Sequence, residues 1–233
     1  YEPDRIKLDS EIKIELKKNN INAKSFNSAL LWEPWQVKNK TGGPYKVFTP
    51  FYKTGCLQST SPRKPLSKPK VINFFKVEHD QSVYKFKYNF KKPHWSDKFK
   101  KHWSPGENGA LERFDHFIKN GSRDYAEGRN FPNKDNVSRI SPHIHWGEIS
   151  PFYIWDISNK FMHGEDKEVF LSEIGWREFS HHLLYHFPKL NKKNLKESFD
   201  GFKWTKNHVD FDKWKLGLTG YPIVDAGMRE LWD

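Results

Sequence analysis

The sequence predicts an α/β remnant over residues 1–30 followed by an all-helical domain over residues 96–233. Three observations support this fold class. Residues 1–30 read as one helix and one short strand. Residues 31–95 contain glycine- and proline-rich stretches with poor periodicity. The second half repeats apolar residues at helical spacing and contains no convincing strand. We therefore expect residues 31–95 to be a connector between the two domains.

The expected α/β remnant consists of one helix and one strand. Residues 8–18 place isoleucine and leucine among charged residues and predict an amphipathic helix, whereas residues 21–26 read as a short strand. A helix followed by a strand is typical of the end of an α/β unit. Because the sequence begins at Tyr1 rather than Met and stops inside a helical pattern, we expect a fragment of a longer protein, truncated at both ends.

Turn and capping residues divide the second half into helices. Residues 104–107 (Ser-Pro-Gly-Glu) predict a capping box that opens a helix ending at residues 120–121 (Asn-Gly). Residues 150–151 (Ser-Pro) open another helix. Residues 166–187 give the longest helical pattern, and the proline that follows ends it. Residues 219–222 (Thr-Gly-Tyr-Pro) begin a last helix that is still running where the sequence stops.

Composition and charge limit the classes of function. The chain has 40 Lys and Arg against 29 Asp and Glu, a net charge of +11, and a pI near 9.5. This balance favours a polyanionic partner such as nucleic acid, with a solvated lysine-rich surface as the alternative. The single cysteine, Cys56, excludes an intramolecular disulfide and a cysteine-based metal cage, and it fits a reducing cytoplasm. No apolar run approaches the roughly 18 residues of a membrane span.

Residues 138–141 (Ser-Arg-Ile-Ser) form the clearest candidate for an anion-binding segment. They precede Pro142 at the start of a short helical pattern and offer hydroxyls, backbone N–H groups and a guanidinium together. These are the donors that bind a phosphodiester or a pyrophosphate. We therefore expect phosphate-bearing ligands to contact this segment.

A second candidate site lies on the longest predicted helix. Glu173, Trp176 and Arg177 are related as i, i+3 and i+4, so they share one face. Gly175 costs about 1 kcal/mol inside a helix and is easier to understand if some group approaches the backbone closely. The alternative is that Trp176 is a core residue and Glu173–Arg177 is a surface pair contributing about 0.2–0.5 kcal/mol.

Long segments of the chain closely resemble the DNA photolyase and cryptochrome family. The resemblance covers nearly the whole chain and rests on residues 30–34, 43–51, 103–111, 125–151, 172–188 and 219–229. It implies that residues 1–30 end a Rossmann-like antenna domain and that residues 31–95 connect the domains. Residues 96–233 would be the first half of the helical FAD- and DNA-binding domain, incomplete at its C-terminus.

The resemblance is greatest to bacterial members that repair cyclobutane pyrimidine dimers. It implies a carbon–carbon lyase, a deoxyribodipyrimidine photo-lyase, in which reduced FAD excited by blue light passes an electron to the dimer. In that family a glutamate matching Glu173 hydrogen-bonds a pyrimidine of the dimer, and a tryptophan matching Trp176 packs against the flipped-out lesion. Photolyases for the six-four photoproduct carry glutamine at the first position, and plant-type cryptochromes tend to replace the tryptophan. Both residues therefore favour dimer repair.

Other residues take expected roles from the same resemblance. Arg177 would lie near the flavin pocket, and Arg129 would contact the DNA backbone beside the lesion. Trp204 would be the surface end of an electron-transfer chain, with a packed core ring as the alternative. The implied flavin contacts are Tyr125, Val137, Ser138, Arg139, Ile140 and Ser141. The family usually has threonine at the position of Val137, so we expect weaker flavin binding there, through the backbone alone.

We expect no metal site. His182 and His186 are spaced as i, i+4 and could share a metal, with His181 beside them, but no further ligand is suggested. The expected cofactor is FAD. A second antenna chromophore of folate or deazaflavin type stays open, because Arg5 replaces a carboxylate that some members use for folate.

The expected partner is UV-damaged DNA, bound by a cytoplasmic monomer without membrane contact. The alternative function is a cryptochrome-type blue-light photoreceptor, the same flavoprotein without repair activity. A third hypothesis, a basic nucleic-acid-binding module without chemistry, needs only the charge and the aromatic residues.

Overall fold

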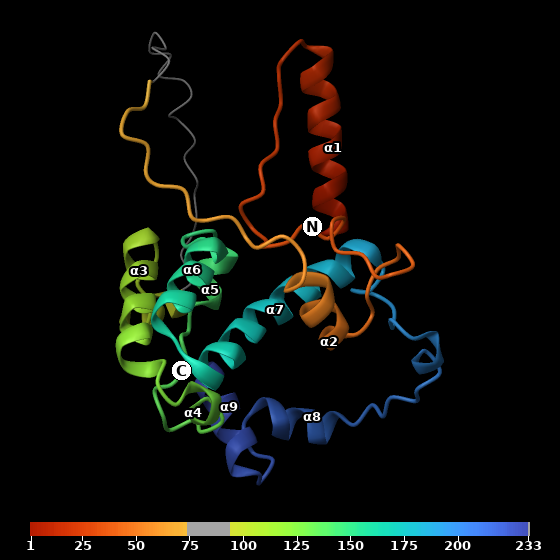
Figure 1. The fold of residues 1–233 in the computed structure, drawn as a ribbon. Coiled ribbons are helices and arrows are strands. Elements are labelled where there is room, and N and C mark those ends of the chain that lie inside the picture. The colour runs from red at the N-terminus through yellow and green to blue at the C-terminus, as the bar shows by residue number, and fades with distance from the viewer. Residues whose placement is uncertain (74–93, 233) are drawn as a thin grey trace. The chain divides into compact units, whose positions relative to one another are not determined.

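The computed structural model describes residues 1–73 and 94–232, and these residues form helices joined by loops (Figure 1). The α-helices are α1 (Pro3–Lys18), α2 (Phe48–Pro50), α3 (Glu107–His116), α4 (Tyr125–Gly128), α5 (Ser141–His145), α6 (Pro151–Phe161), α7 (Gly164–His186), α8 (His208–Lys215) and α9 (Pro222–Trp232). Wider or tighter helical turns are η1 (Phe51–Cys56), η3 (His94–Lys101), η4 (Phe117–Gly121) and η5 (Glu197–Phe199). No strand occurs in the described ranges, so the predicted helical second half is confirmed.

The described residues fall into two compact units. One comprises residues 1–73 and 104–192, and the other comprises residues 94–103 and 193–232. We call them the first and the second unit. The division at residues 30 and 95 that the sequence predicts stays a prediction, as does the α/β origin of residues 1–30.

The predicted strand at residues 21–26 is wrong. A helix does precede it, but none of that helix's residues is buried, so the expected apolar face is not packed against the protein. α1 begins at Pro3, earlier than expected, with the proline in its first turn. Residues 21–28 have no ladder hydrogen bonds, and Phe26 is 83% exposed. A strand satisfies its backbone groups through a neighbouring strand, and the described part of the chain offers none.

The predicted capping box at residues 104–107 is also wrong. α3 begins at Glu107, its N-cap is Gly106, and no side chain caps it. Gly106 has a φ of 98°, a backbone conformation that a serine or glutamate would rarely adopt, so the chain turns before the helix can include Pro105. A backbone hydrogen bond from Gly106 instead reaches the carboxylate of Glu148.

The other predicted helix starts are confirmed. Ser150 caps α6 by accepting a hydrogen bond from the backbone N–H of Phe152 at 3.2 Å. α7 covers residues 164–186 and ends just before the proline at position 188. α9 begins at Pro222 as expected.

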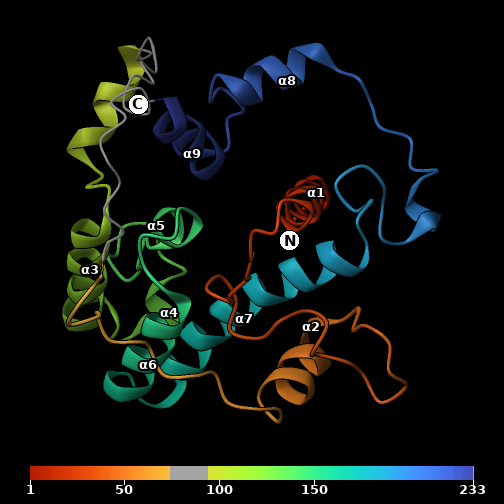
Figure 2. The same cartoon turned by 90° about the horizontal axis from the view of Figure 1, so that it is seen from above.

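The core of the first unit is built mainly from aromatic rings around α7, the longest helix. Figures 1 and 2 show α7 running alongside α4, α6 and the segment that contains α2 and η1. On one side, Phe170 packs against Phe114, Phe117 and Tyr125 with ring centroids 4.9–6.5 Å apart. On the other side, Phe51 and its neighbours cover the second half of the helix. Part of the expected connector therefore belongs to this core.

Gly175 allows one of these close contacts. A Cβ at position 175 would lie 2.5 Å from a carbon of the Tyr52 ring, which is itself only 7% exposed. The close approach that a glycine inside a helix indicated is thus confirmed, and the approaching group is a tyrosine ring. Cys56 lies at the end of the same turn of chain, 1% exposed, and burial raises the pKa of its thiol well above its ordinary value.

The second unit contains η3, η5, α8 and α9. Asn207 caps α8, a helix that the sequence pattern did not predict, by accepting from the backbone N–H groups of Val209 and Asp210. Asp225 in α9 accepts hydrogen bonds from Thr219 and Gly220, which fixes the turn that leads into that helix. Among the described residues, no helix is both long enough and apolar enough to cross a membrane.

Candidate flavin and substrate site

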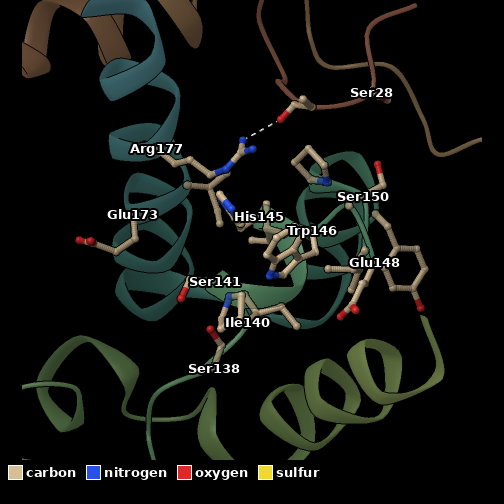
Figure 3. Close-up of a pocket in the computed structure, with 18 of the residues that line it drawn as sticks. Ser28, Ser138, Ile140, Ser141, His145, Trp146, Glu148, Ser150, Glu173 and Arg177 are labelled. Atoms are coloured by element: carbon tan, nitrogen blue, oxygen red, sulfur yellow. Dashed lines mark hydrogen bonds between the residues drawn. The ribbon is translucent and has the colours of Figure 1, made fainter. Parts of the chain in front are cut away.

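A cavity of about 1610 Å³ opens in the first unit, between α7 and the segment around α5 (Figure 3). It exceeds the roughly 300–1,000 Å³ of ordinary small-molecule sites, so it suits a ligand of dinucleotide size. Among its lining residues are Tyr125, Val137, Ser138, Arg139, Ile140, Ser141, Glu148, Glu173, Ile174, Arg177 and His181. Every residue expected to contact flavin therefore lies on one cavity, although those residues come from separate parts of the sequence.

Two polar anchors place α4 and the loop after it against this cavity. The carboxylate of Asp166, in the first turn of α7, accepts the backbone N–H groups of Asp124 and Ala126 at 2.9 and 2.8 Å. The side-chain amide of Asn136 donates to the carbonyls of Gly121 and Arg123 at 3.1 and 2.8 Å. These bonds fix the start of α4 and the residue that leads into segment 137–141.

Segment 137–141 lines the cavity with both backbone and side chains. Arg139 has a φ of 50°, a left-handed conformation that few non-glycine residues adopt. The next residue, Ile140, is buried, and α5 begins at Ser141. Figure 3 shows Ser138 and Ser141 close to each other on the cavity wall, with Ile140 beside them. The residues expected from the sequence to bind phosphate therefore all line the cavity.

Tyr125 is held rigidly in the wall of the cavity. Its ring is 6% exposed and meets Phe117 and Phe170 edge to face, at centroid distances of 5.6 and 5.3 Å. Burial raises the pKa of its hydroxyl, and the positive charge of Arg129 opposes the rise. The guanidinium of Arg129 lies 5.5 Å from the centre of the Tyr125 ring, within the range of a cation–π contact.

Arg129 and Glu173 form an ion pair between α7 and the end of α4. Arg129 Nη1 lies 2.6 Å from Glu173 Oε1, and the side chains are 29% and 37% exposed. The hydrogen bond to Glu173 is the main reason that the pKa of Arg129 is raised. Glu173 therefore pairs with Arg129, and the alternative of a Glu173–Arg177 surface pair is wrong.

Arg177 lies one helical turn beyond Glu173 on α7 and binds different partners. Its Nη1 donates to the backbone carbonyl of Ala29 at 2.7 Å, and this bond is the dashed line beside Ser28 in Figure 3. The same nitrogen lies 3.3 Å from Glu178 Oε1. Burial lowers the pKa of Arg177, while the negative charge of Glu178 opposes the decrease. In Figure 3 the Arg177 side chain reaches toward residue 28, whereas Glu173 points away from Trp146.

Trp176 and Trp204 do not line the cavity, and neither is a core residue. Trp176 is 45% exposed and stacks on Phe48 with ring centroids 3.7 Å apart. Trp204 belongs to the second unit, is 82% exposed and touches Phe202 edge to face. The alternative that either ring is packed in a core is therefore wrong for the described structure.

The three candidate histidines of α7 contact the protein backbone. His182 Nε2 accepts the backbone N–H of Tyr45 at 3.2 Å, and burial lowers the pKa of its ring to about 4. His186 Nε2 lies 3.1 Å from the carbonyl of Pro34, and His181 Nδ1 lies 2.9 Å from that of Arg177. Within residues 1–73 and 94–232, no group of three or more His, Cys, Asp or Glu side chains is placed to hold a metal ion.

Sequence reasoning missed a second carboxylate in the cavity wall. Glu148 Oε2 lies 2.6 Å from Nδ1 of the buried His143, and this bond is the main reason that the pKa of Glu148 is lowered. The pair fixes the turn after α5, in which Gly147 has a φ of 72°. A glycine followed by a glutamate after a short helix was the only available indication, and it is a weak one.

Comparisons with known proteins identify the family of the chain. Residues 1–70 match the family described as DNA photolyase, and residues 170–233 match the FAD binding domain of DNA photolyase. The chain therefore belongs to the DNA photolyase and cryptochrome family, as the sequence resemblance predicted.

Individual relatives of the chain include both a photo-lyase and a cryptochrome. The chain is 41% identical over 236 residues to the deoxyribodipyrimidine photo-lyase of Agrobacterium fabrum, covering 100% of this chain and 49% of the relative. It is 31% identical over 245 residues to cryptochrome-1 of Arabidopsis thaliana, covering 100% and 36%. A bacterial class III photolyase structure from Agrobacterium tumefaciens superposes with a TM-score of 0.83 at 40% identity, covering 100% and 49%. The chain thus spans half or less of these relatives.

Proposed function

We propose that the protein containing this chain repairs cyclobutane pyrimidine dimers in DNA with light, using excited reduced FAD as the electron donor. The observation that carries this proposal is the gathering of the expected flavin contacts on one cavity, with Glu173 at the same cavity and Trp176 one helical turn further along α7. The 41% identity to a deoxyribodipyrimidine photo-lyase supports the same activity.

The residues of the cavity fit a flavin dinucleotide. Ser138, Arg139 and Ser141 would hold the pyrophosphate through hydroxyls, backbone N–H groups and a guanidinium. Val137 would contribute its backbone alone, and Tyr125 would close the wall beside the cofactor. FAD, when bound in its reduced form and excited, supplies the electron that opens the dimer, and the chain's own residues bind, orient and shield the reactants.

Glu173 would orient the dimer through its carboxylate. The carboxylate lies 2.6 Å from the Arg129 guanidinium and can also accept a hydrogen bond from a ring N–H of a pyrimidine. That bond would fix one pyrimidine of the dimer beside the cavity. Trp176, 45% exposed and one turn further along α7, would pack against the flipped-out bases.

Arg129 can serve both Glu173 and the DNA backbone. A guanidinium has five N–H donors, and Glu173 engages it through Nη1. Because Arg129 is 29% exposed, its other donors would remain for a phosphate beside the lesion. The chain's net charge of +11 supports DNA as the partner, and binding should weaken steeply with salt.

A cryptochrome-type photoreceptor is the second candidate function. The 31% identity to an Arabidopsis cryptochrome supports it. Such a protein would need the flavin cavity but would not need Glu173 or Trp176 for repair. The exposed position of Trp204 fits the surface end of an electron-transfer chain in either candidate. The monomeric state and the cytoplasmic location stay predictions, and the antenna chromophore stays open.

The decisive experiment uses the full-length gene product, photoreduced without oxygen. An oligonucleotide carrying one thymine dimer is incubated with it in blue light and in darkness, and intact thymines are quantified by chromatography. We expect thymines to return only in the light. A flavin-loaded protein that repairs nothing would favour the photoreceptor, and a DNA-binding protein without flavin would favour a binding module without chemistry.

A further inference from the structure

Trp176 belongs to a row of three stacked aromatic rings beside α7. Its ring lies almost parallel to that of Phe48, with an angle of 9° and centroids 3.7 Å apart. Phe48 in turn lies parallel to Tyr52, again at 9°, with centroids 5.4 Å apart. Phe48 opens α2 and Tyr52 lies in η1, so both rings come from a segment far from Trp176 in the sequence.

Contacts with Gly175 and Phe179 fix the positions of these rings. Gly175 lets the Tyr52 ring approach the backbone of α7, since a Cβ there would lie 2.5 Å from the ring. Phe179, which is buried, meets the edges of both Trp176 and Phe48 at centroid distances of 5.9 Å. None of these rings can tilt without disturbing its neighbours, so the plane of the Trp176 ring is set by the row.

The stacking leaves Trp176 accessible from one side. Phe48 covers one face of the indole at contact distance, and Phe179 meets its edge. The residue is nevertheless 45% exposed, and these two ring contacts lie on one face and one edge of the indole. An indole with one face covered and the other open is a platform for a single flat partner.

We propose that Phe48 is a positioning residue for lesion recognition. It fixes the plane of Trp176 so that the opposite face receives the bases of an extruded pyrimidine dimer. This inference rests on the proposed function, and it assigns to Phe48 a role through Trp176 rather than a contact with DNA. An indole already fixed in its bound orientation loses little conformational freedom when a base stacks on it, which strengthens binding.

The test replaces the ring of Phe48 in the full-length, FAD-loaded protein and measures dimer binding in darkness. Phe48→Leu removes the flat face but keeps an apolar side chain of similar size, whereas Phe48→Tyr keeps the ring. We expect Phe48→Leu to bind a thymine-dimer oligonucleotide about fivefold more weakly, on the scale of one base–aromatic stack. Phe48→Tyr should stay within about twofold of the natural protein.

Three further readouts distinguish positioning from general damage to the fold. Affinity for undamaged DNA and FAD content should be unchanged in Phe48→Leu, and repair per absorbed photon at saturating dimer should fall little. The neighbouring Val47→Ala is the matched control, because Val47 is 61% exposed and its side chain lies outside the ring row. Loss of FAD and of both DNA affinities in Phe48→Leu would overturn the proposal.

A double-mutant cycle shows whether Phe48 acts through Trp176. In a Trp176→Ala background, Phe48→Leu should change dimer affinity by less than about twofold, since the ring it positions is gone. An undiminished effect in that background would overturn the proposal, as would equal affinities of Phe48→Leu and Phe48→Tyr. Failure of the proposed function would be recognised separately, because the natural protein itself would then neither prefer nor repair the dimer.

Discussion

Two glutamates five positions apart on α7 have opposite environments. Glu178 is 1% exposed, and its Oε2 accepts the backbone N–H groups of Leu31 and Trp32 at 2.8 and 3.1 Å. Glu173 has a side chain 37% exposed and pairs with Arg129 beside the cavity. The first carboxylate holds two segments of the protein together, and the second is available to a ligand. The comparison teaches that depth of burial, rather than residue type, makes one of these carboxylates structural and leaves the other accessible.

The pKa of Glu178 reflects its burial. Burial raises the pKa of Glu178 to about 8, although the hydrogen bonds from Trp32 and Leu31 and the charge of Arg177 oppose the rise. Glu173 faces a permanent cation at 2.6 Å and stays open to water. Glu178 is thus buried among its backbone partners, whereas Glu173 lies at the surface of the protein beside a guanidinium.

The largest expected effect comes from removing the buried carboxylate. Glu178→Ala should lower the free energy of unfolding by about 3 kcal/mol, because two buried backbone N–H groups and Arg177 lose their acceptor. Urea denaturation of the full-length protein measures it. Glu173→Ala is the control and should cost below about 1 kcal/mol, as expected for a partly exposed ion pair. Similar losses in the two variants would contradict the contrast between the two residues.

A smaller effect is expected from pH. Because the folded protein raises the pKa of Glu178 from an ordinary value near 4.5 to about 8, the folded state binds its proton more tightly than the unfolded state. This stabilisation is complete below the ordinary pKa and is lost as pH rises toward about 8. Between pH 5 and pH 7 the loss should reach about 2 kcal/mol.

The variant Glu178→Gln isolates that contribution. Its amide keeps an oxygen acceptor for the backbone N–H groups of Leu31 and Trp32 but has no proton to lose. Denaturation midpoints measured from pH 5 to pH 8 should therefore fall less steeply in this variant than in the natural protein. Parallel curves would mean that the Glu178 carboxyl titrates near its ordinary pKa.

The smallest effect on stability, and the clearest effect on function, is expected from a change at Glu173. Glu173→Gln should change the free energy of unfolding by about 0.5 kcal/mol or less and leave FAD content unchanged. Repair per absorbed photon should fall by about threefold to tenfold, since a neutral amide is a weaker acceptor for a pyrimidine N–H than a carboxylate. Unchanged repair in the full-length protein would remove the role proposed for Glu173.

Local sequence patterns were sufficient for most of the helices. The serine–proline pair at 150–151 and the long apolar repeat of residues 166–187 predicted α6 and α7, because caps and periodicity are properties of neighbouring residues. The strand at residues 21–26 and the capping box at residues 104–107 failed for a different reason. Each depended on a partner or a backbone turn that the local pattern does not encode.

The cavity was predictable only through family resemblance. Segment 137–141 and α7 line the same cavity, but no periodicity or spacing within either segment indicates that they meet. The pairing of Arg129 with Glu173 and the stacking of Phe48 on Trp176 are tertiary contacts between distant parts of the chain. Such contacts follow from how α7 packs, and a single sequence does not record that packing.

The burial of Cys56 allows its reaction with a thiol reagent to report local opening of the protein. A thiol that is 1% exposed, with its pKa raised well above the ordinary value, has almost no thiolate and no path to reagent while the first unit stays closed. Because it is the only cysteine among these 233 residues, a thiol-specific reagent can modify the chain at that one sulfur alone. Its modification rate would record how often the packing of η1 against α7 opens, residue-specifically and without any introduced label.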